Sequence, residues 1–236
     1  MRPLAVTPAT VEVWRVHLDR LDHATAAWLD ALPSAEQERA RRFRADEARL
    51  RFVTGRVVLR HLLGGRLRIP PPEIPIVVGE RGKPHLAEGT LPRWHFNLSH
   101  SGSLVLVALT ESGPVGVDVE TMRPLDHWRA LAARSFSPAE VRELESLTAA
   151  ERTPAFFATW TRREALLKAT GAGLAGTLGR ELIPGPEWTL LNFLAAPGHP
   201  AAVAVRHPGA ALVLNDFSPS RITQHGSRSP HAPSPR

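Results

Sequence analysis

The chain has 236 residues, an apolar fraction of 43% and a formal net charge of +6. These values are sufficient for one large domain or two modest ones with a packed core. The positive charge favours a polyanionic ligand, such as a nucleic acid, an anionic membrane surface or a nucleotide phosphate, without choosing among them. Because the chain has no cysteine, disulfides and thiolate metal sites are excluded.

The sequence shows no sign of export or of membrane insertion. Its first 19 residues lack the apolar core of a secretory signal. No apolar run approaches the roughly 18 residues that a membrane-spanning helix needs. We therefore expect a cytoplasmic protein that is not embedded in a membrane.

In chain order, the first part is predicted to contain a strand, a helical region and a short strand. Residues 11–19 alternate apolar and polar side chains, as a half-buried strand does. In residues 33–65, Ser34 is a plausible N-cap, no proline interrupts the pattern, and a Gly-Gly pair after Leu63 predicts the end of the helix. Two helices or one bent helix should result. Residues 72–86 predict a strand followed by a glycine-containing turn.

The second part is predicted to alternate strands and helices. Residues 94–120 indicate two strands joined by a turn at 111–114. Ser137 as N-cap and Pro138 at the first helical position predict the start of a helix. A second helix is expected from residue 155, closed by Gly171 and Gly173. The further predictions are strands at 187–194, 201–207 and 210–217, and a disordered tail rich in Ser, Pro and Arg at 218–236.

Asp118 and Glu120 are the first candidate site residues. In a strand, carboxylates separated by one residue lie on the same face. Such a pair suits Mg²⁺, which takes one or two protein carboxylates together with phosphate oxygens and water. The alternative is a solvated strand edge. Val115, Val117 and Val119 would supply the buried face of this strand.

Glu140 has two possible roles. It stands three residues after Ser137, where a capping box places a glutamate that bonds back to the N-cap amide. It could also be a third carboxylate for a metal. The spacing leaves both roles open.

Ser99 and His100 do not fit a nucleophile and its base. Neighbouring residues in a strand point to opposite faces, and no G-x-S-x-G motif is present. A serine hydrolase is therefore disfavoured. Both side chains could donate hydrogen bonds to phosphate oxygens, or they could serve ordinary turn chemistry around Gly102.

Glu164 and Lys168 are four residues apart, so they are neighbours on one face of the predicted helix. An exposed pair of this kind is worth only about 0.3–0.5 kcal/mol. The preceding Phe156 and Phe157 indicate that the helix is largely buried, which favours a functional role for its polar face.

An arginine-rich segment spans residues 39–60. Its pattern is typical of a solvated amphipathic face, and the alternative is phosphate or nucleic-acid binding. Helix-turn-helix, zinc-finger and RNP patterns are absent, which argues against a nucleic-acid partner. The arginines are Arg39, Arg41, Arg42, Arg44, Arg49, Arg51, Arg56 and Arg60.

Taken together, the motifs resemble those of the 4′-phosphopantetheinyl transferases, of the long, two-halved type that acts on carrier proteins of polyketide and non-ribosomal peptide synthesis. The matching segments cover most of the chain in the expected order. They are RGKPHL at 81–86, FNLSHSG at 96–102, GVDVE at 116–120, FSPAE at 136–140 and WTRREALLKATGAGL at 160–174.

The resemblance implies a coenzyme A site and a metal site. Gly82, Lys83 and Pro84 resemble the loop that holds the adenine nucleotide. Asn97, Leu98, Ser99 and His100 resemble the segment that contacts its phosphates. Arg39 and Arg51 are candidates for the 3′-phosphate. Asp118 and Glu120 match metal ligands beside the pyrophosphate, and Glu140 matches the third ligand. Lys168 matches a pyrophosphate-binding lysine, and Glu164 matches a metal ligand or a base.

Two residues depart from the family pattern. Arg163 stands where a lysine usually precedes the helix glutamate, and its planar guanidinium does not readily exchange a proton. Glu36 stands where some relatives have a basic residue for the 3′-phosphate. Affinity for coenzyme A would then depend more on Arg39 and its neighbours.

The implied fold is α/β, with two pseudo-symmetric halves that each pack helices on a small, mainly antiparallel sheet, and a ligand cleft between them. The halves would cover residues 1–113 and 114–217. The implied reaction transfers 4′-phosphopantetheine from coenzyme A to a serine of an apo acyl or peptidyl carrier protein, with Mg²⁺ or Mn²⁺, in a monomer. Two alternatives stay open: another metal-dependent phosphotransferase or pyrophosphatase, and a non-catalytic binding module.

Overall fold

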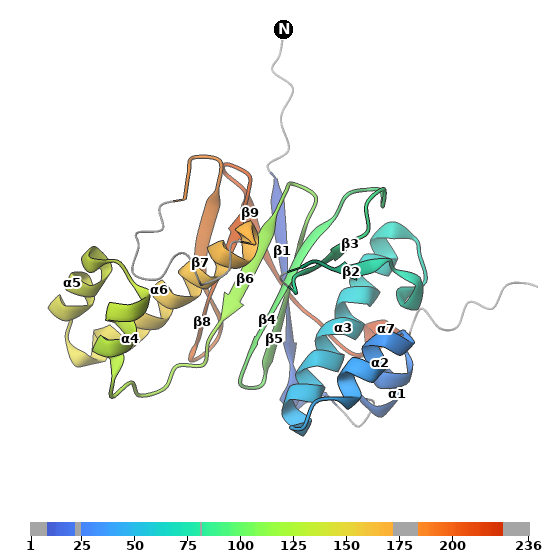
Figure 1. The fold of residues 1–236 in the computed structure, drawn as a ribbon, viewed down its shortest axis with the longest axis horizontal. Coiled ribbons are helices and arrows are strands. Elements are labelled where there is room, and N and C mark those ends of the chain that lie inside the picture. The colour runs from blue at the N-terminus through green and yellow to red at the C-terminus, as the bar shows by residue number, and fades with distance from the viewer. Residues whose placement is uncertain (1–8, 22–24, 81, 172–183, 224–236) are drawn as a thin grey trace, which may run out of the picture.

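The computed structural model describes residues 9–21, 25–80, 82–171 and 184–223 (Figure 1). One four-stranded sheet has the order β4-β5-β1-β9. Its strands are β1 (Thr10–His17), β4 (His95–Ser101), β5 (Leu104–Thr110) and β9 (Ala211–Asp216). A three-stranded antiparallel sheet has the order β6-β8-β7, formed by β6 (Val115–Val119), β7 (Thr189–Ala196) and β8 (His199–Val205). β2 (Ile76–Val78) and β3 (Pro84–Leu86) form a separate hairpin.

Helices cover the outer faces of the two sheets. α1 (Thr25–Asp30), α2 (Ser34–Arg41) and α3 (Asp46–Leu67) lie on the four-stranded sheet's side, and α4 (Trp128–Ser135), α5 (Pro138–Ser146) and α6 (Ala149–Thr170) lie on the other side (Figure 1). Short helices complete the described chain: η1 (Leu18–Arg20), η2 (Pro71–Glu73) and α7 (Ser220–Thr223). The predicted α/β fold with small, mainly antiparallel sheets is confirmed.

Alternation along the strands explains why the sheets are layered in this way. In β5, Leu104, Leu106 and Ala108 pack in a core that both sheets share. The intervening residues Val105 and Val107 pack against α3 in a second core. β5 is therefore buried on both faces, and the sheets lie between two layers of helices.

The predicted strand at 11–19 and the predicted helix starting at Ser137 are confirmed. Ser137 caps α5 in a complete capping box with Glu140, and Pro138 is the first helical residue. α6 ends at Thr170, and its C-cap Gly171 adopts a left-handed φ of 71°. The second predicted closing residue, Gly173, lies outside the described residues.

Two predicted details of the helical segment are wrong. The Gly-Gly pair does not end α3, which continues to Leu67 because Leu63 and Leu67 are held in the core. A Cβ at Gly64 would lie 2.9 Å from the Ile69 carbonyl oxygen, so this glycine permits close packing of the following chain. Ser34 is the first residue of α2 rather than its cap, since Pro33 occupies the N-cap position with no side-chain hydrogen bond.

The prediction of two strands in residues 94–120 is also wrong, because three strands form there. Gly102 turns the chain between β4 and β5 with a φ of +55°, which favours glycine. The expected turn at 111–114 then separates β5 from β6.

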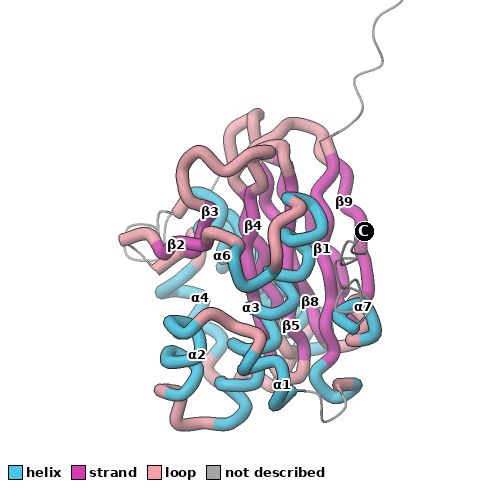
Figure 2. Tube along the Cα trace, turned by 90° about the vertical axis from the view of Figure 1, so that its right-hand side faces the viewer, coloured by secondary structure: helices cyan, strands magenta, loops and turns pink. Residues whose placement is uncertain are grey.

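β9 follows the second sheet in the sequence but pairs with β1 of the first sheet, in parallel (Figure 2). The chain therefore returns across the proposed boundary at Gly113. The first residues of the predicted tail form α7, and Ile222 packs against the cores beside α3. Residues 224–236 lie outside the described residues.

Candidate active site

The two sheets meet where β4 lies along β6, and side chains of β4 accept hydrogen bonds from backbone amides of the opposite edge. The amide of Val117 donates to Asn97 Oδ1 at 3.0 Å, and the amide of Thr121 donates to the Ser101 hydroxyl at 2.9 Å. The amide of Val119 donates to the Ser99 hydroxyl at 3.4 Å. We call this contact the β4–β6 seam.

Ser99, Asp118 and Lys168 meet at the middle of the β4–β6 seam. Lys168 Nζ lies 2.6 Å from Asp118 Oδ1 and 3.0 Å from the Ser99 hydroxyl. Ser99 in turn donates to Asp118 Oδ1 at 2.9 Å. Ser99 and His100 are not partners, as their positions in a strand predicted.

The predicted contact of α6 with this centre depends on one glycine. A Cβ at Gly116 would lie 2.1 Å from the Ala165 carbonyl oxygen and 2.4 Å from the Ala169 amide nitrogen. Only glycine allows the helix backbone to rest directly on β6 in this way. Glu164 and Lys168 are thereby brought within reach of Asp118.

Three carboxylates share this region. Asp118 is only 5% exposed, and its Oδ2 is buried without a hydrogen-bond partner. Burial and then the charge of Asp118 raise the pKa of Glu120. The same two causes raise the pKa of Glu164, and Glu120 adds to the repulsion. Lys168 pairs with Asp118, and Arg123 lies 3.9 Å from Glu120. Three carboxylates thus face two cations, which leaves a surplus of negative charge.

The surplus of negative charge raises the question of whether a divalent cation fits the site. No group of three or more His, Cys, Asp or Glu side chains in the described chain is arranged closely enough to hold a metal ion. Mg²⁺, however, commonly uses one or two carboxylates and takes its other ligands from substrate phosphates and water. The unpartnered Asp118 Oδ2 and the neighbouring Glu120 fit that requirement.

Glu140 has other partners in the structure. Its Oε2 accepts hydrogen bonds from the Ser137 amide at 2.8 Å and from Arg163 Nη1 at 2.8 Å. Arg162 approaches the other oxygen at 3.9 Å. The cap role is confirmed, and the arginine that replaces the usual lysine forms a buried ion pair with Glu140.

A pocket of about 390 Å³ contains most of the residues predicted to bind coenzyme A. The predicted residues that line it are Arg39, Arg51, Gly82, Pro84, Asn97, Leu98 and His100. Every lining residue precedes Gly113, so this cavity belongs to the first half and reaches the β4–β6 seam at Asn97. We call it the arginine pocket.

Positive charge surrounds an aromatic wall of the arginine pocket. The guanidinium carbon of Arg39 lies 5.1 Å from the centre of the Phe52 ring. Arg51 donates to the Gly102 carbonyl oxygen at 2.9 Å and pairs with Glu47 at 3.0 Å. Desolvation lowers the pKa of His100, and the charges of Arg51 and Lys168 lower it further. An anion carrying a planar ring fits these walls.

Arg56 is a pocket residue that the sequence analysis did not single out. It is 6% exposed, its guanidinium carbon lies 5.6 Å from the Phe52 ring centre, and its Nη1 has no hydrogen-bond partner. Glu36 lies 3.7 Å away but is engaged by Arg60, which donates at 2.8 and 3.0 Å. One buried carboxylate thus serves two buried arginines. The spacing of four residues from Phe52 is the signal that could have identified Arg56.

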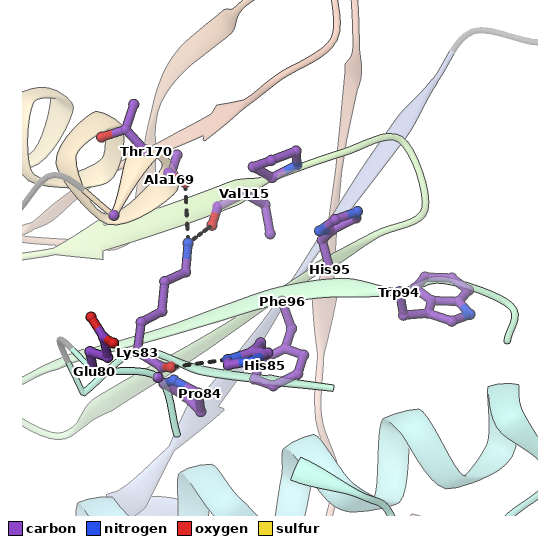
Figure 3. A pocket seen from close by; sticks show the side chains of 13 residues that line it. Glu80, Lys83, Pro84, His85, Trp94, His95, Phe96, Val115, Ala169 and Thr170 are labelled. Atoms are coloured by element: carbon purple, nitrogen blue, oxygen red, sulfur yellow. Dashed lines mark hydrogen bonds between the residues drawn. The ribbon is translucent and has the colours of Figure 1, made fainter. Parts of the chain in front are cut away.

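Lys83 does not line the arginine pocket, unlike its neighbours Gly82 and Pro84. Its side chain lines a second cavity of about 550 Å³, between the β2–β3 hairpin and the end of α6 (Figure 3). There the ammonium donates to the carbonyl oxygens of Val115, Lys168 and Ala169. Arg81, which begins the RGKPHL motif, lies outside the described residues.

Comparison with known proteins identifies the family of this chain. Residues 14–112 match the N-terminal family of 4′-phosphopantetheinyl transferases, and residues 114–203 match the 4′-phosphopantetheinyl transferase superfamily. The chain is 38% identical to the 4′-phosphopantetheinyl transferase HetI of Nostoc sp. (strain PCC 7120) over 83% of this chain and 87% of that protein. The chain belongs to the 4′-phosphopantetheinyl transferase family.

Two further relatives of this transferase come from bacilli. A 4′-phosphopantetheinyl transferase of Bacillus subtilis is 33% identical over 70% of this chain and 72% of its own length. The transferase psf-1 of Bacillus pumilus is 32% identical over 73% of this chain and 78% of its own length. Enzymes of this family transfer phosphopantetheine from coenzyme A to carrier proteins.

In the part of this chain that the structure describes, no helix is both long and apolar enough to cross a bilayer.

Proposed function

We propose that this transferase moves 4′-phosphopantetheine from coenzyme A to a serine of an apo acyl or peptidyl carrier protein and releases adenosine 3′,5′-bisphosphate. One observation links this reaction to particular residues. The β4–β6 seam holds the contact of Ser99, Asp118 and Lys168, and the same seam reaches the arginine pocket at Asn97. A nucleotide anion held in the pocket would therefore present its pyrophosphate to Lys168.

In this proposal the arginine pocket holds the adenosine 3′-phosphate end of coenzyme A. Arg39, Arg51 and Arg56 would attract the phosphate, because arginine donors suit phosphate oxygens. Gly82 and Pro84 would border the adenine. His100 would hydrogen-bond a phosphate oxygen. Arg56 supplies the charge that is missing at the position of Glu36.

Asp118 Oδ2 and Glu120 would hold Mg²⁺, or Mn²⁺, beside the pyrophosphate. Such an ion, when bound, neutralises negative charge on the phosphoryl oxygens. Glu140 is engaged by Ser137 and Arg163, and Glu164 is the third carboxylate whose pKa responds to Asp118. The proposed metal site therefore uses Asp118 and Glu120, and Glu140 is not assigned to it.

Glu164 is the proposed base. Its raised pKa suits it to accept the proton of the carrier serine hydroxyl, directly or through water. The serine oxygen then forms a bond to the β-phosphorus, and the bond from that phosphorus to the bridging oxygen breaks. Lys168 stabilises the charge that develops on the pyrophosphate, and the pair of electrons leaves with adenosine 3′,5′-bisphosphate.

The same proposal includes the partner protein, the oligomeric state and the cellular location of the transferase. A net charge of +6 favours encounter with acidic carrier domains. One chain supplies both the arginine pocket and the residues of β6 and α6, which supports a monomer. Coenzyme A as co-substrate supports a cytoplasmic site of action.

Intact-mass spectrometry tests the reaction. An apo carrier protein incubated with this transferase, coenzyme A and Mg²⁺ should gain one phosphopantetheine, and a chelator should abolish the gain. Cleavage of coenzyme A without any carrier would instead indicate a pyrophosphatase. Binding of coenzyme A with neither outcome on several unrelated carriers would indicate a non-catalytic module.

A further inference from the structure

Lys83 connects the nucleotide loop to the catalytic helix. In this loop Gly82 lines the arginine pocket and Pro84 lines both cavities, whereas the Lys83 side chain extends across the second cavity (Figure 3). Its ammonium lies 3.2 Å from the carbonyl oxygens of both Val115 and Ala169, and it also donates to that of Lys168. The three acceptors are at the start of β6 and the end of α6.

These carbonyls need an outside donor. The last carbonyls of a helix have no intrahelical partner. At the end of α6, Gly171 donates to the Leu167 carbonyl, and among the described residues Lys83 is the donor to the carbonyls of Lys168 and Ala169. Lys168 repeats the arrangement, because its own ammonium lies 3.3 Å from the Val117 carbonyl oxygen. The two lysines thus bind alternate carbonyls of the same β6 edge.

The choice of residue type supports a carbonyl-binding role. Lys83 and Lys168 are the two lysines of a chain that contains 27 arginines. An ammonium is compact and directs three donors to separate acceptors, whereas a guanidinium is a planar fork that suits carboxylates and phosphates. Lys83 binds three backbone carbonyls with its ammonium, whereas Arg60, which also reaches three carbonyls, does so with one nitrogen and directs its other two nitrogens to Glu36. Burial lowers the pKa of Lys83.

We infer that Lys83 is a positioning residue that holds the last turn of α6 against β6, so that Lys168 reaches Asp118 and the pyrophosphate. Lys83 also links the loop that borders the nucleotide to the catalytic helix, α6. In the proposed function Gly82 and Pro84 border the nucleotide, whereas the Lys83 ammonium is directed to β6 and α6. The inference rests on the proposed function for its kinetic readout, but its structural readout is independent of that function.

Lys83→Met and Lys83→Arg test the inference by separating binding from catalysis. Calorimetry with adenosine 3′,5′-bisphosphate should give a Kd within about twofold of the wild-type value, because no nucleotide contact is lost. The kcat for transfer to a saturating carrier should fall by about tenfold or more in Lys83→Met. Lys83→Arg retains the charge without the geometry and should restore only part of that loss.

A double-mutant cycle with Lys168→Met tests whether Lys83 acts through Lys168. If it does, Lys83→Met should reduce kcat by less than about twofold once Lys168 is absent. Additive losses would show that Lys83 acts elsewhere. Arg93→Met, which removes an exposed positive charge near the same cavity, is the matched control and should leave kcat unchanged.

Hydrogen exchange supplies the readout that needs no activity. In Lys83→Met, amides of residues 165–171 should exchange faster, while amides of α3 should not change. Unchanged exchange at the end of α6 overturns the inference, and so does a Kd that rises tenfold at constant kcat. If the wild-type protein transfers nothing yet its α6 amides still respond to Lys83→Met, the proposed function fails and the positioning role stands. If Lys83→Met does not fold, the same measurements on Lys83→Arg test the inference.

Discussion

The two carboxylate oxygens of Asp118 have different surroundings. Oδ1 receives Ser99 and Lys168, while Oδ2 is buried and has no partner. A buried carboxylate oxygen without a partner costs stability, so its retention favours a functional role. Lys168 depends on the same residue for its orientation. The chemistry of the site is therefore concentrated in a single side chain.

Replacement of Asp118 by asparagine keeps the shape of the side chain and removes its charge. We expect kcat/KM to fall by about 100-fold or more, because Lys168 loses its counter-charge and the proposed metal loses a ligand. The Kd for adenosine 3′,5′-bisphosphate should change little, since Asp118 does not line the arginine pocket. Kinetics with calorimetry measures both. Unchanged transfer at ordinary Mg²⁺ concentrations would contradict the metal assignment.

The raised pKa of Glu120 predicts how stability depends on pH. Burial and Asp118 raise this pKa above the ordinary value of 4.5. The unfolded chain therefore ionises first as pH rises, and the folded state loses stability above about pH 4.5. Glu120→Gln should raise the Tm by a few degrees at pH 8, since about 1 kcal/mol shifts Tm by about 2–4 °C at this size.

Thermal melts of both proteins across pH 4–8 check the sign. The stabilisation by Glu120→Gln should disappear below pH 4.5, where both states bind the proton. Mg²⁺ should raise the Tm of the wild type more than that of the variant. A stabilisation that does not vary with pH would contradict the electrostatic cause.

Arg56 is expected to recognise the 3′-phosphate. Its loss should remove a charge-assisted contact worth about 1.5–3 kcal/mol, or about 10-fold to 100-fold in affinity. Arg56→Met should therefore weaken binding of adenosine 3′,5′-bisphosphate and leave binding of adenosine 5′-monophosphate unchanged. Arg41→Met, on an exposed part of α2, is the control. Equal weakening for both nucleotides would argue against a role at the 3′-phosphate.

At the scale of elements, α6 and β6 form the unit that presents the catalytic side chains. Gly116 lets the helix backbone contact the strand, and the small Ala165 and Ala169 face it. The capping box at Ser137 fixes the start of α5, and Glu140 in that box also pairs with Arg163 of α6. The caps and the small residues together fix the position of α6 on β6, and this position determines where Glu164 and Lys168 approach Asp118.

Gly116→Ala tests this close packing. Its Cβ would lie 2.1 Å from a backbone oxygen, so the helix must move, at a cost of about 1–3 kcal/mol. We expect a lower Tm and a loss of transfer. Gly65→Ala is the control, because Gly65 is inside α3 with nothing within 4 Å of its Cβ position. That substitution should stabilise the protein by about 0.5–1 kcal/mol. Denaturant titration measures both.

At the scale of the whole molecule, two features tie the halves together. The sheets share a core that contains Val11 and Leu106 from one sheet and Val117 and Val203 from the other. β9 then crosses back to pair with β1. The β4–β6 seam is the place where the two sheets meet through side chains. It leaves the polar groups of Ser99 and Asp118 at an interface instead of in a backbone ladder.

Asn97→Ala tests the β4–β6 seam. The buried Val117 amide would lose its acceptor, at a cost of about 1–3 kcal/mol. The halves should nevertheless unfold in a single calorimetric transition, because the shared core and β9 join them. Two resolved transitions in the variant would show that the β4–β6 seam provides most of the coupling between halves.

The sequence by itself determined the features that depend on neighbouring residues. Alternating valines predicted the buried face of β6, Ser137 and Pro138 predicted the start of α5, and the spacing of Glu164 and Lys168 placed both on one helix face. These features follow from periods of two and of about 3.6 residues and from hydrogen bonds within a few positions. The order of motifs also indicated the family, which the comparisons confirmed.

Only the tertiary structure decided which distant groups become partners. It directed Lys83 to the end of α6, paired Glu140 with Arg163, brought Arg56 to the pocket wall and returned β9 to β1. It also carried α3 through Gly64, since a glycine inside a packed helix and a glycine at a helix end look alike in sequence. Contacts between residues far apart in the chain depend on how the sheets and helices stack, and local periodicity does not encode that arrangement.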